Sequence, residues 1–300
     1  INTAAMTVAD ASTLTVGTGA VGAPTIASVT GANGGGAASN LTLNSTGVAS
    51  VGAVGTNIGT VTVTQSGGTT FSSTVDAVAV TLTDTTGTIQ FDGALTATDL
   101  NTAAKGYGVS LLGGSTISNA VTFSNTGTTQ IGDATGDTNT FNGGVTATAG
   151  AVTASGSVVT SEDNLALGAV TLVEAQTLTL DTANTGGGNI TVASLTGVTG
   201  GSSENITLES GSGTITVSGA VGTDIGTLTV MQSGGTTFAS TVGAATVTLT
   251  DTTGTIQFDG ALTATDLNTA AQDYGVSLLG GSTIANAVTI LNTGNFEIGG

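Results

Sequence analysis

Residues 55–71 read GTNIGTVTVTQSGGTTF, and residues 222–238 read GTDIGTLTVMQSGGTTF. They open a longer match between residues 55–133 and 222–300, in which 63 of 79 positions are identical at a constant offset of 167. Within each stretch apolar residues alternate with Thr, which is the period of a β-strand that buries one face. The Gly pair that follows is typical of a turn. The sequence therefore predicts an all-β fold made of long internal repeats.

The match continues upstream of these stretches with small gaps. SNLTLNS at 39–45 corresponds to ENITLES at 204–210, and IASVTG at 26–31 corresponds to VASLTG at 192–197. We therefore predict two repeat units, residues 1–167 and residues 168–300, the second being a truncated copy that continues the same solenoid. Because the second copy stops early, we expect the chain to be a fragment of a longer array.

The spacing of the strands favours a parallel β-solenoid, also called a β-helix. The strand centres Leu43, Val63 and Leu82 recur at roughly 20-residue intervals, in the range of solenoid repeats. Tandem immunoglobulin-like sandwiches are the alternative, but these have a period of about 100 residues and a buried Trp, which this chain lacks. For residues 98–104, and for their copy at 265–271, we expect a single helical turn at most. We expect the seven Phe residues to stack in the core.

The composition excludes most enzyme chemistry and several partners. The chain has no His, no Cys and one basic residue, Lys105, so imidazole, thiolate and zinc chemistry are excluded. A formal net charge of −18 disfavours nucleic acid and anionic membranes as partners. No apolar run approaches the length of a transmembrane segment. The lack of Cys is a hint of bacterial export. We expect no enzyme, with a glycosidase that uses two carboxylates as a remaining alternative.

The residue pattern of the repeat is also seen in a known class of proteins. It is visible in GTIQFDGALTATDLN at 87–101, GGSTISNAVTFSNTG at 113–127 and GNITVASLTG at 188–197. These strings resemble the β-helical repeats of filamentous-haemagglutinin-type adhesins and autotransporter passengers, including giant β-strand-repeat surface proteins. The resemblance implies a right-handed parallel β-helix on the bacterial cell surface, used as a stalk, adhesin or fibre. No secretion signal or carbohydrate-binding domain of that family has matching residues here.

Calcium is the ligand that best suits the available side chains, because hard cations bind carboxylate and amide oxygens. The strongest candidate cluster is Asp133, Asp137, Asn139 and Asn142 in GDATGDTNTFN, and a weaker one is Glu162, Asp163 and Asn164. Neither cluster matches the spacing of an EF-hand or of a calcium-binding coil. The alternative is that these residues cap turns through local hydrogen bonds. Apart from this calcium, we expect no cofactor.

These observations favour a structural role outside the cell. We expect a stalk or adhesin segment of a much larger extracellular protein, with further repeats of the same chain or a cell-surface or host polysaccharide as partner. The first alternative is a filament subunit whose solenoids dock end to end with other copies of the chain. The second is an ice-binding protein, because ranks of outward Thr such as Thr62 and Thr64 order water; irregular coil lengths weaken this alternative.

Overall fold

The computed structural model describes residues 2–20, 22–33, 37–182, 186–222 and 224–299. These residues form strands and turns without any helix, and so contain no helix that could cross a membrane. They group into two compact units: unit 1 holds residues 1–132 and 137–143, and unit 2 holds residues 133–136 and 144–300. The repeat boundary between residues 167 and 168 stays a prediction.

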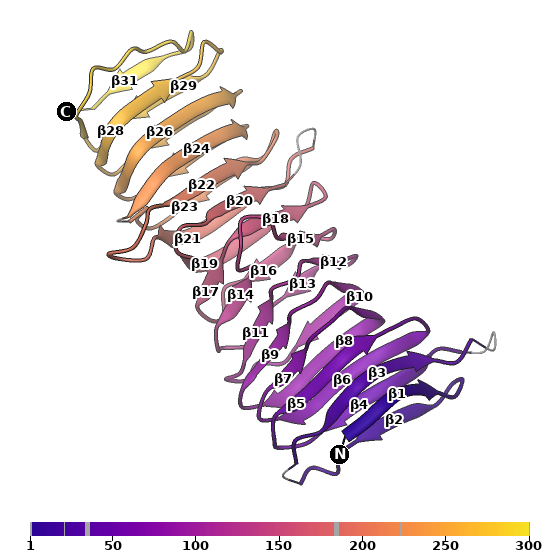
Figure 1. Ribbon diagram of the computed structural model, residues 1–300. Helices are drawn as coiled ribbons and strands as arrows, with labels where there is room; N and C mark the ends of the chain where they lie inside the picture. Colours follow the sequence, from indigo (N-terminus) through magenta and orange to yellow (C-terminus); the bar gives the residue numbers. More distant parts are fainter. Residues whose placement is uncertain (1, 21, 34–36, 183–185, 223, 300) are drawn as a thin grey trace. The chain divides into compact units, whose positions relative to one another are not determined.

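Unit 1 consists of short strands that follow one another around successive coils (Figure 1). Their bounds are β1 (Asn2–Val8), β2 (Thr13–Val16), β3 (Thr25–Gly31), β4 (Ser39–Asn44), β5 (Ala49–Val54), β6 (Ile58–Ser66), β7 (Thr69–Phe71), β8 (Val75–Thr85), β9 (Thr88–Phe91), β10 (Leu95–Thr102), β11 (Gly108–Leu111), β12 (Ser115–Ile117), β13 (Val121–Thr122), β14 (Thr129–Ile131) and β15 (Thr138–Phe141).

Unit 2 is built in the same way. Its strands are β16 (Val145–Ala147), β17 (Val152–Ala154), β18 (Gly156–Thr160), β19 (Leu165–Leu172), β20 (Thr177–Asp181), β21 (Ile190–Thr196), β22 (Glu204–Glu209), β23 (Thr214–Val217), β24 (Ile225–Ser233), β25 (Gly235–Phe238), β26 (Val242–Thr252), β27 (Thr255–Phe258), β28 (Leu262–Thr269), β29 (Gly275–Leu278), β30 (Ser282–Ile284) and β31 (Phe296–Ile298).

Within each unit, strands pair in parallel with strands of the neighbouring coil. In unit 1, β4 pairs with β6 and β6 with β8, so that Leu41, Val61 and Val80 lie opposite one another. In unit 2, β22 pairs with β24 and β24 with β26 in the same manner. Parallel pairing at this sequence separation defines a β-solenoid, and it rules out immunoglobulin-like sandwiches, whose sheets are antiparallel. The predicted fold class is confirmed.

The alternation of apolar residues with Thr turns the apolar side chains into the coils. There, apolar residues of successive coils stack into columns. One column of unit 1 contains Val51, Phe71, Phe91, Leu111 and Ile131, all fully buried. The rings of Phe71 and Phe91 stack with centroids 4.8 Å apart, and those of their copies Phe238 and Phe258 lie 4.9 Å apart. The expectation of a stacked Phe core is confirmed for these positions. It is wrong for Phe296, which is 38% exposed.

The helical turn expected near residues 98–104 is wrong, because β10 covers most of this segment. Its buried positions are Leu95, Ala97 and Leu100. Thr98 is skipped in the pairing of β10 with β8. The interval between buried positions is two residues from Leu95 to Ala97 but three residues from Ala97 to Leu100. A three-residue interval resembles the spacing of a helix. The copy in unit 2, β28, passes over Thr265 in the same way.

Two buried tyrosines hold a turn of each unit from within. The hydroxyl of Tyr107 donates to the carbonyl of Leu82 at 2.9 Å and accepts the backbone N–H of Ala103 at 2.9 Å. Tyr274 makes the equivalent bonds to the carbonyl of Leu249 and the N–H of Ala270. Burial raises the pKa of both tyrosines, although their backbone hydrogen bonds act in the opposite direction. The Ala103 N–H also donates to the Leu82 carbonyl, and the Ala270 N–H to the Leu249 carbonyl, both at 2.9 Å. Each phenol therefore adds two hydrogen bonds to a backbone pair that the turn already forms.

Stacked glycines form one corner of the coils. A Cβ atom on Gly87 would collide with the carbonyl oxygen of Gly67 in the preceding coil. The same collision would occur between Gly254 and Gly234 in unit 2. Only a residue without a side chain allows the two backbones to approach so closely.

Candidate functional site

The most regular surface of each unit is a rank of outward Thr residues, here called the threonine face. In unit 1 the rank runs through β2, β4, β6 and β8, and in unit 2 through β20, β22, β24 and β26. Its members face one another in register: Thr15, Thr42, Thr62 and Thr81 in unit 1, and Thr179, Thr207, Thr229 and Thr248 in unit 2. Neighbouring strands in a sheet are about 4.8 Å apart, so each rank is a periodic row of hydroxyls and methyls.

The coil loops absorb the irregular spacing of the sequence. Thr42 follows Thr15 by 27 residues, whereas Thr81 follows Thr62 by only 19, yet both pairs are in register. Irregular coil lengths therefore do not disrupt the threonine face, and that objection to ice binding is wrong. Thermal hysteresis and shaping of ice crystals by the chain would support ice binding, and the absence of both would exclude it.

An irregularity that both copies share beside the threonine face shows how side chains support the ladder. The ladder β4–β6 and the ladder β22–β24 each shift register at their first and last pairs. At the first shift, the side-chain oxygen of Asn40 accepts the N–H of Thr60 at 2.9 Å. Asn205 accepts the N–H of Thr227 at 2.9 Å in the second copy. These Asn residues satisfy donors at positions where the ladder is irregular.

Carboxylates on the outer surface pair with amides of nearby residues. Asp99 accepts a hydrogen bond from the amide of Asn119 at 2.8 Å, one coil later, and Asp266 accepts one from Asn286 at 2.7 Å. Asp92 accepts the amide of Gln90 at 2.5 Å. In these positions the carboxylates tie coils and strand ends together rather than facing a second acid.

One edge of the threonine face differs in charge between the units. In unit 2, Asp181 lies opposite Glu209 on the neighbouring strand. Burial raises the pKa of Glu209, and the negative charge of Asp181 raises it further. In unit 1 the position of Glu209 holds the neutral Asn44. The next strand places a Gln opposite in both units, Gln65 beside Asn44 and Gln232 beside Glu209. The pair Asp181 and Glu209 therefore makes this edge more acidic in unit 2.

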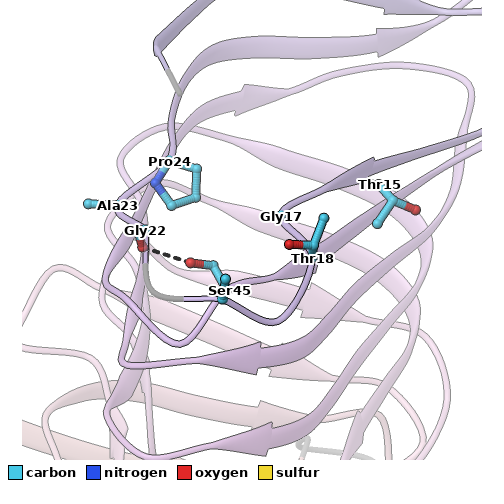
Figure 2. A pocket seen from close by; sticks show the side chains of 8 residues that line it. Thr15, Gly17, Thr18, Gly22, Ala23, Pro24 and Ser45 are labelled. Carbon is cyan, nitrogen blue, oxygen red and sulfur yellow. Dashed lines mark hydrogen bonds between the residues drawn. The ribbon is translucent and has the colours of Figure 1, made fainter.

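Three surface hollows show what the chain offers to a small ligand. A hollow of about 490 Å³ in unit 1 is lined by small and hydroxyl-bearing residues, and the Ser45 hydroxyl donates to the Gly22 carbonyl at 2.7 Å (Figure 2). Two others, of about 340 and 360 Å³, each contain one carboxylate, Asp76 and Asp273. A carboxylate glycosidase needs two acids. That the chain is not an enzyme stays a prediction.

The four residues of the predicted calcium cluster differ in burial and in the compact unit to which they belong. Asp133 is exposed and belongs to unit 2, whereas Asp137, Asn139 and Asn142 belong to unit 1. Asn139 is fully buried, and its side-chain oxygen accepts a hydrogen bond from the Ser115 hydroxyl at 2.7 Å inside the core. Asp137 and Asn142 are half-buried. Calcium binding by these four residues stays a prediction.

The weaker cluster lies in a turn whose groups serve the backbone. Glu162 has a positive φ of 67°, the Asp163 carbonyl accepts the Thr160 hydroxyl at 2.6 Å, and the Asn164 side-chain oxygen accepts the N–H of Asn189 at 2.9 Å. In the part of the chain that the structure describes, no group of three or more His, Cys, Asp or Glu residues is placed to hold a metal.

Glu204 is a buried acid that the sequence reading did not single out. It shares the inward face of β22 with Ile206 and Leu208 and is 0% exposed. The period-two alternation of ENITLE was a signal that could have found it, because positions 204, 206 and 208 face the same side.

Comparison with known proteins finds no matching family model, no matching curated protein and no matching solved structure. The fold is therefore known from the chain's own geometry, which is that of a β-helical repeat protein.

Proposed function

We propose that this chain is a segment of an extracellular bacterial surface protein, in which the β-solenoid serves as a stalk or adhesin. The observation that carries the proposal is the in-register stacking of coils within each unit, with a buried apolar column inside and neutral threonine faces outside. Such a structure gains stability from contacts between neighbouring coils and can be lengthened by adding repeats. The residue pattern that the chain shares with filamentous-haemagglutinin-type adhesins and autotransporter passengers supports the same role.

The surface chemistry suits a protein that acts outside the cell. Lys105 is the only basic residue of the sequence and is exposed, so trypsin-like proteases have a single cleavage site. For the adhesin role, we propose a cell-surface or host polysaccharide as the partner, because hydroxyl and amide groups dominate the outer faces. Hydroxyls and amides can exchange hydrogen bonds with a sugar polymer.

The location can be tested with antibodies raised against residues 1–300. We expect them to label intact cells of the source bacterium, and we expect the label to disappear after the cells are treated with proteinase K. Labelling that requires permeabilised cells would contradict the proposal. A cytoplasmic protein detected in parallel controls for cell lysis.

A self-assembling filament is the second candidate, and exposed apolar side chains in unit 2 favour it. Leu291, Phe296 and Ile298 are 51%, 38% and 66% exposed. A further coil of the same chain or a second copy of the chain would cover them. Electron microscopy of the purified chain separates the two: long filaments with a layer line near about 4.8 Å support docking between copies, and short discrete particles support a single-chain stalk.

A further inference from the structure

Two acidic residues of unit 2 lie side by side at one corner of successive coils. Glu204 begins β22, and its N–H donates to the carbonyl oxygen of Asp224 at 3.1 Å. Glu204 also pairs with Ile225, the residue after Asp224. Asp224 has a positive φ of 66°, which marks the corner. The two carboxylates therefore belong to adjacent positions of neighbouring coils.

Each of these carboxylates has a buried oxygen without a hydrogen-bond partner. Oε2 of Glu204 accepts the N–H of Val198 at 3.3 Å, whereas its Oε1 atom is buried and unpartnered. Oδ2 of Asp224 is also buried and unpartnered. Burying an acceptor without a donor is costly, and more so when the acceptor carries a charge. These two oxygen atoms therefore lack a donor or a positive charge beside them.

The first copy of the repeat shows what this corner requires. Ser39 stands at the position of Glu204, and its hydroxyl donates to the carbonyl of Ala9 at 2.8 Å. Asn57 stands at the position of Asp224, has a nearly identical φ of 63°, and donates from its amide to the side-chain oxygen of Asn33 and to the carbonyl of Ala32. In the first copy both side chains are thus donors toward oxygen atoms of the chain.

The second copy replaces both donors with groups that only accept when they are ionised. Val198 follows the stretch 192–197 as Ala32 follows 26–31. The N–H of Ala32 donates to the carbonyl of Val8 at 2.8 Å, but that of Val198 donates to Glu204 instead. The backbone fold is kept while the corner changes from donor-rich to acceptor-rich, and a cation is the simplest group that satisfies several acceptors at once.

We propose that Glu204 and Asp224 bind a calcium ion at this corner, together with carbonyl oxygens of the loop 197–203. Calcium takes six to eight oxygen ligands, among them carboxylates and backbone carbonyls, and tolerates irregular geometry. The ion would supply the positive charge that replaces the two lost donors. This site is separate from the cluster predicted at Asp133 and Asp137 and does not depend on where the protein is located.

The test uses the full chain after removal of metal with EDTA and dialysis. Calorimetric titration with calcium chloride is expected to show one site that contains Glu204. Calcium at about a hundredfold excess over its dissociation constant is expected to raise the melting temperature of unit 2 by roughly 5 °C. The decisive variant is the double substitution E204S and D224N, which introduces the residues of the first copy and so keeps a corner known to fold.

We expect this double variant to fold, to lose the calcium-dependent rise in melting temperature, and to weaken binding at least about tenfold. The matched control is D137N, which should keep the full response because Asp137 is not part of this corner. The proposal is overturned if calcium produces neither heat nor a melting shift in the unmodified chain, or if the double variant responds as the unmodified chain does.

Discussion

The two copies of the repeat have the same strands but different polar chemistry at the same places. Strands β6 and β24 share one pattern of buried and exposed positions, residue by residue, and their buried apolar residues exchange only for apolar ones, as with Val61 and Leu228. At the coil corner, however, Ser39 and Asn57 become Glu204 and Asp224. The coil constrains inward volume and register tightly, and it leaves the polar positions free to take on new interactions.

Removing a ring of the shared aromatic stack should lower the free energy of unfolding most, and by the same amount in both copies. Phe91→Ala and Phe258→Ala each remove a fully buried ring that stacks on its neighbour, and we expect each to cost about 3–5 kcal/mol of unfolding free energy. Denaturant titration followed by circular dichroism measures this cost. Phe296→Ala is the control and should cost less, because that ring is 38% exposed. A neutral result for Phe91 would contradict the core assignment.

Removing the buried tyrosine hydroxyls should also affect both copies alike. Tyr107→Phe removes the hydroxyl that bonds both the Leu82 carbonyl and the Ala103 N–H, which remain bonded to each other at 2.9 Å, and we expect a cost of about 1–2 kcal/mol. Tyr274→Phe should cost the same. Denaturant titration followed by circular dichroism measures the cost of each substitution. An unchanged free energy of unfolding in both variants would argue against the phenol contacts.

The same residues predict an alkaline limit to stability. Burial raises the pKa of Tyr107 and Tyr274 above the ordinary value of 10.0, so the folded chain holds these protons more tightly than the unfolded chain. The corresponding stability is present below pH 10 and is lost as the pH rises through the raised pKa. The double variant with both Tyr→Phe substitutions should therefore lose less stability than the unmodified chain over that window.

The Asn residues at the register shifts should have a smaller effect. Asn40→Ala removes the acceptor for the Thr60 N–H, and Asn205→Ala removes the acceptor for the Thr227 N–H. We expect each substitution to cost about 1 kcal/mol, measured by denaturant titration. Thr42→Ala, on the outward threonine face, is the control and should be nearly neutral. Equal costs at Asn40 and Thr42 would show that the register shift needs no side-chain acceptor.

The smallest expected effect is on the pH dependence of stability, and it should arise in the second copy only. Burial and the neighbouring Asp181 raise the pKa of Glu209, so the folded chain binds this proton more tightly than the unfolded chain. The proton-linked stability is present at low pH and is lost as the pH rises from 4.5 through the raised pKa. Glu209→Asn, which introduces the Asn44 of the first copy, should reduce this loss. Identical pH profiles of melting temperature for the two proteins would contradict the assignment.

The fold was predictable because alternation and repetition are properties of the sequence itself. The pattern of Leu41, Val61 and Val80 identifies inward positions without any structure. The pairing partners were harder to predict, because loops of unequal length lie between strands, as the 27-residue step from Thr15 to Thr42 shows. The irregularity at Thr98 resembles helical spacing in the sequence, because a local irregularity in a strand produces the same three-residue interval between buried positions.

The candidate sites were less predictable, because neighbours in sequence need not share a face. Proximity in sequence groups Asn139 with Asp137, but Asn139 faces the core and bonds to Ser115. Conversely, Glu204 and Asp224 are 20 residues apart and meet only because the coil brings them together. A ligand site on a solenoid is formed across coils, so the register must be known before its residues can be chosen.

The central claim is that the coils stack in parallel with the register described, and engineered disulfides test it directly. The chain has no cysteine, so an introduced pair is unambiguous. Thr229 lies opposite Thr248, where neighbouring strands are about 4.8 Å apart, whereas Thr250 is two residues out of register and about 8 Å away. We expect the pair T229C and T248C to cross-link rapidly under mild oxidation, and the pair T229C and T250C to remain reduced. Preferential cross-linking of the second pair, or no cross-linking of the first, would contradict the solenoid.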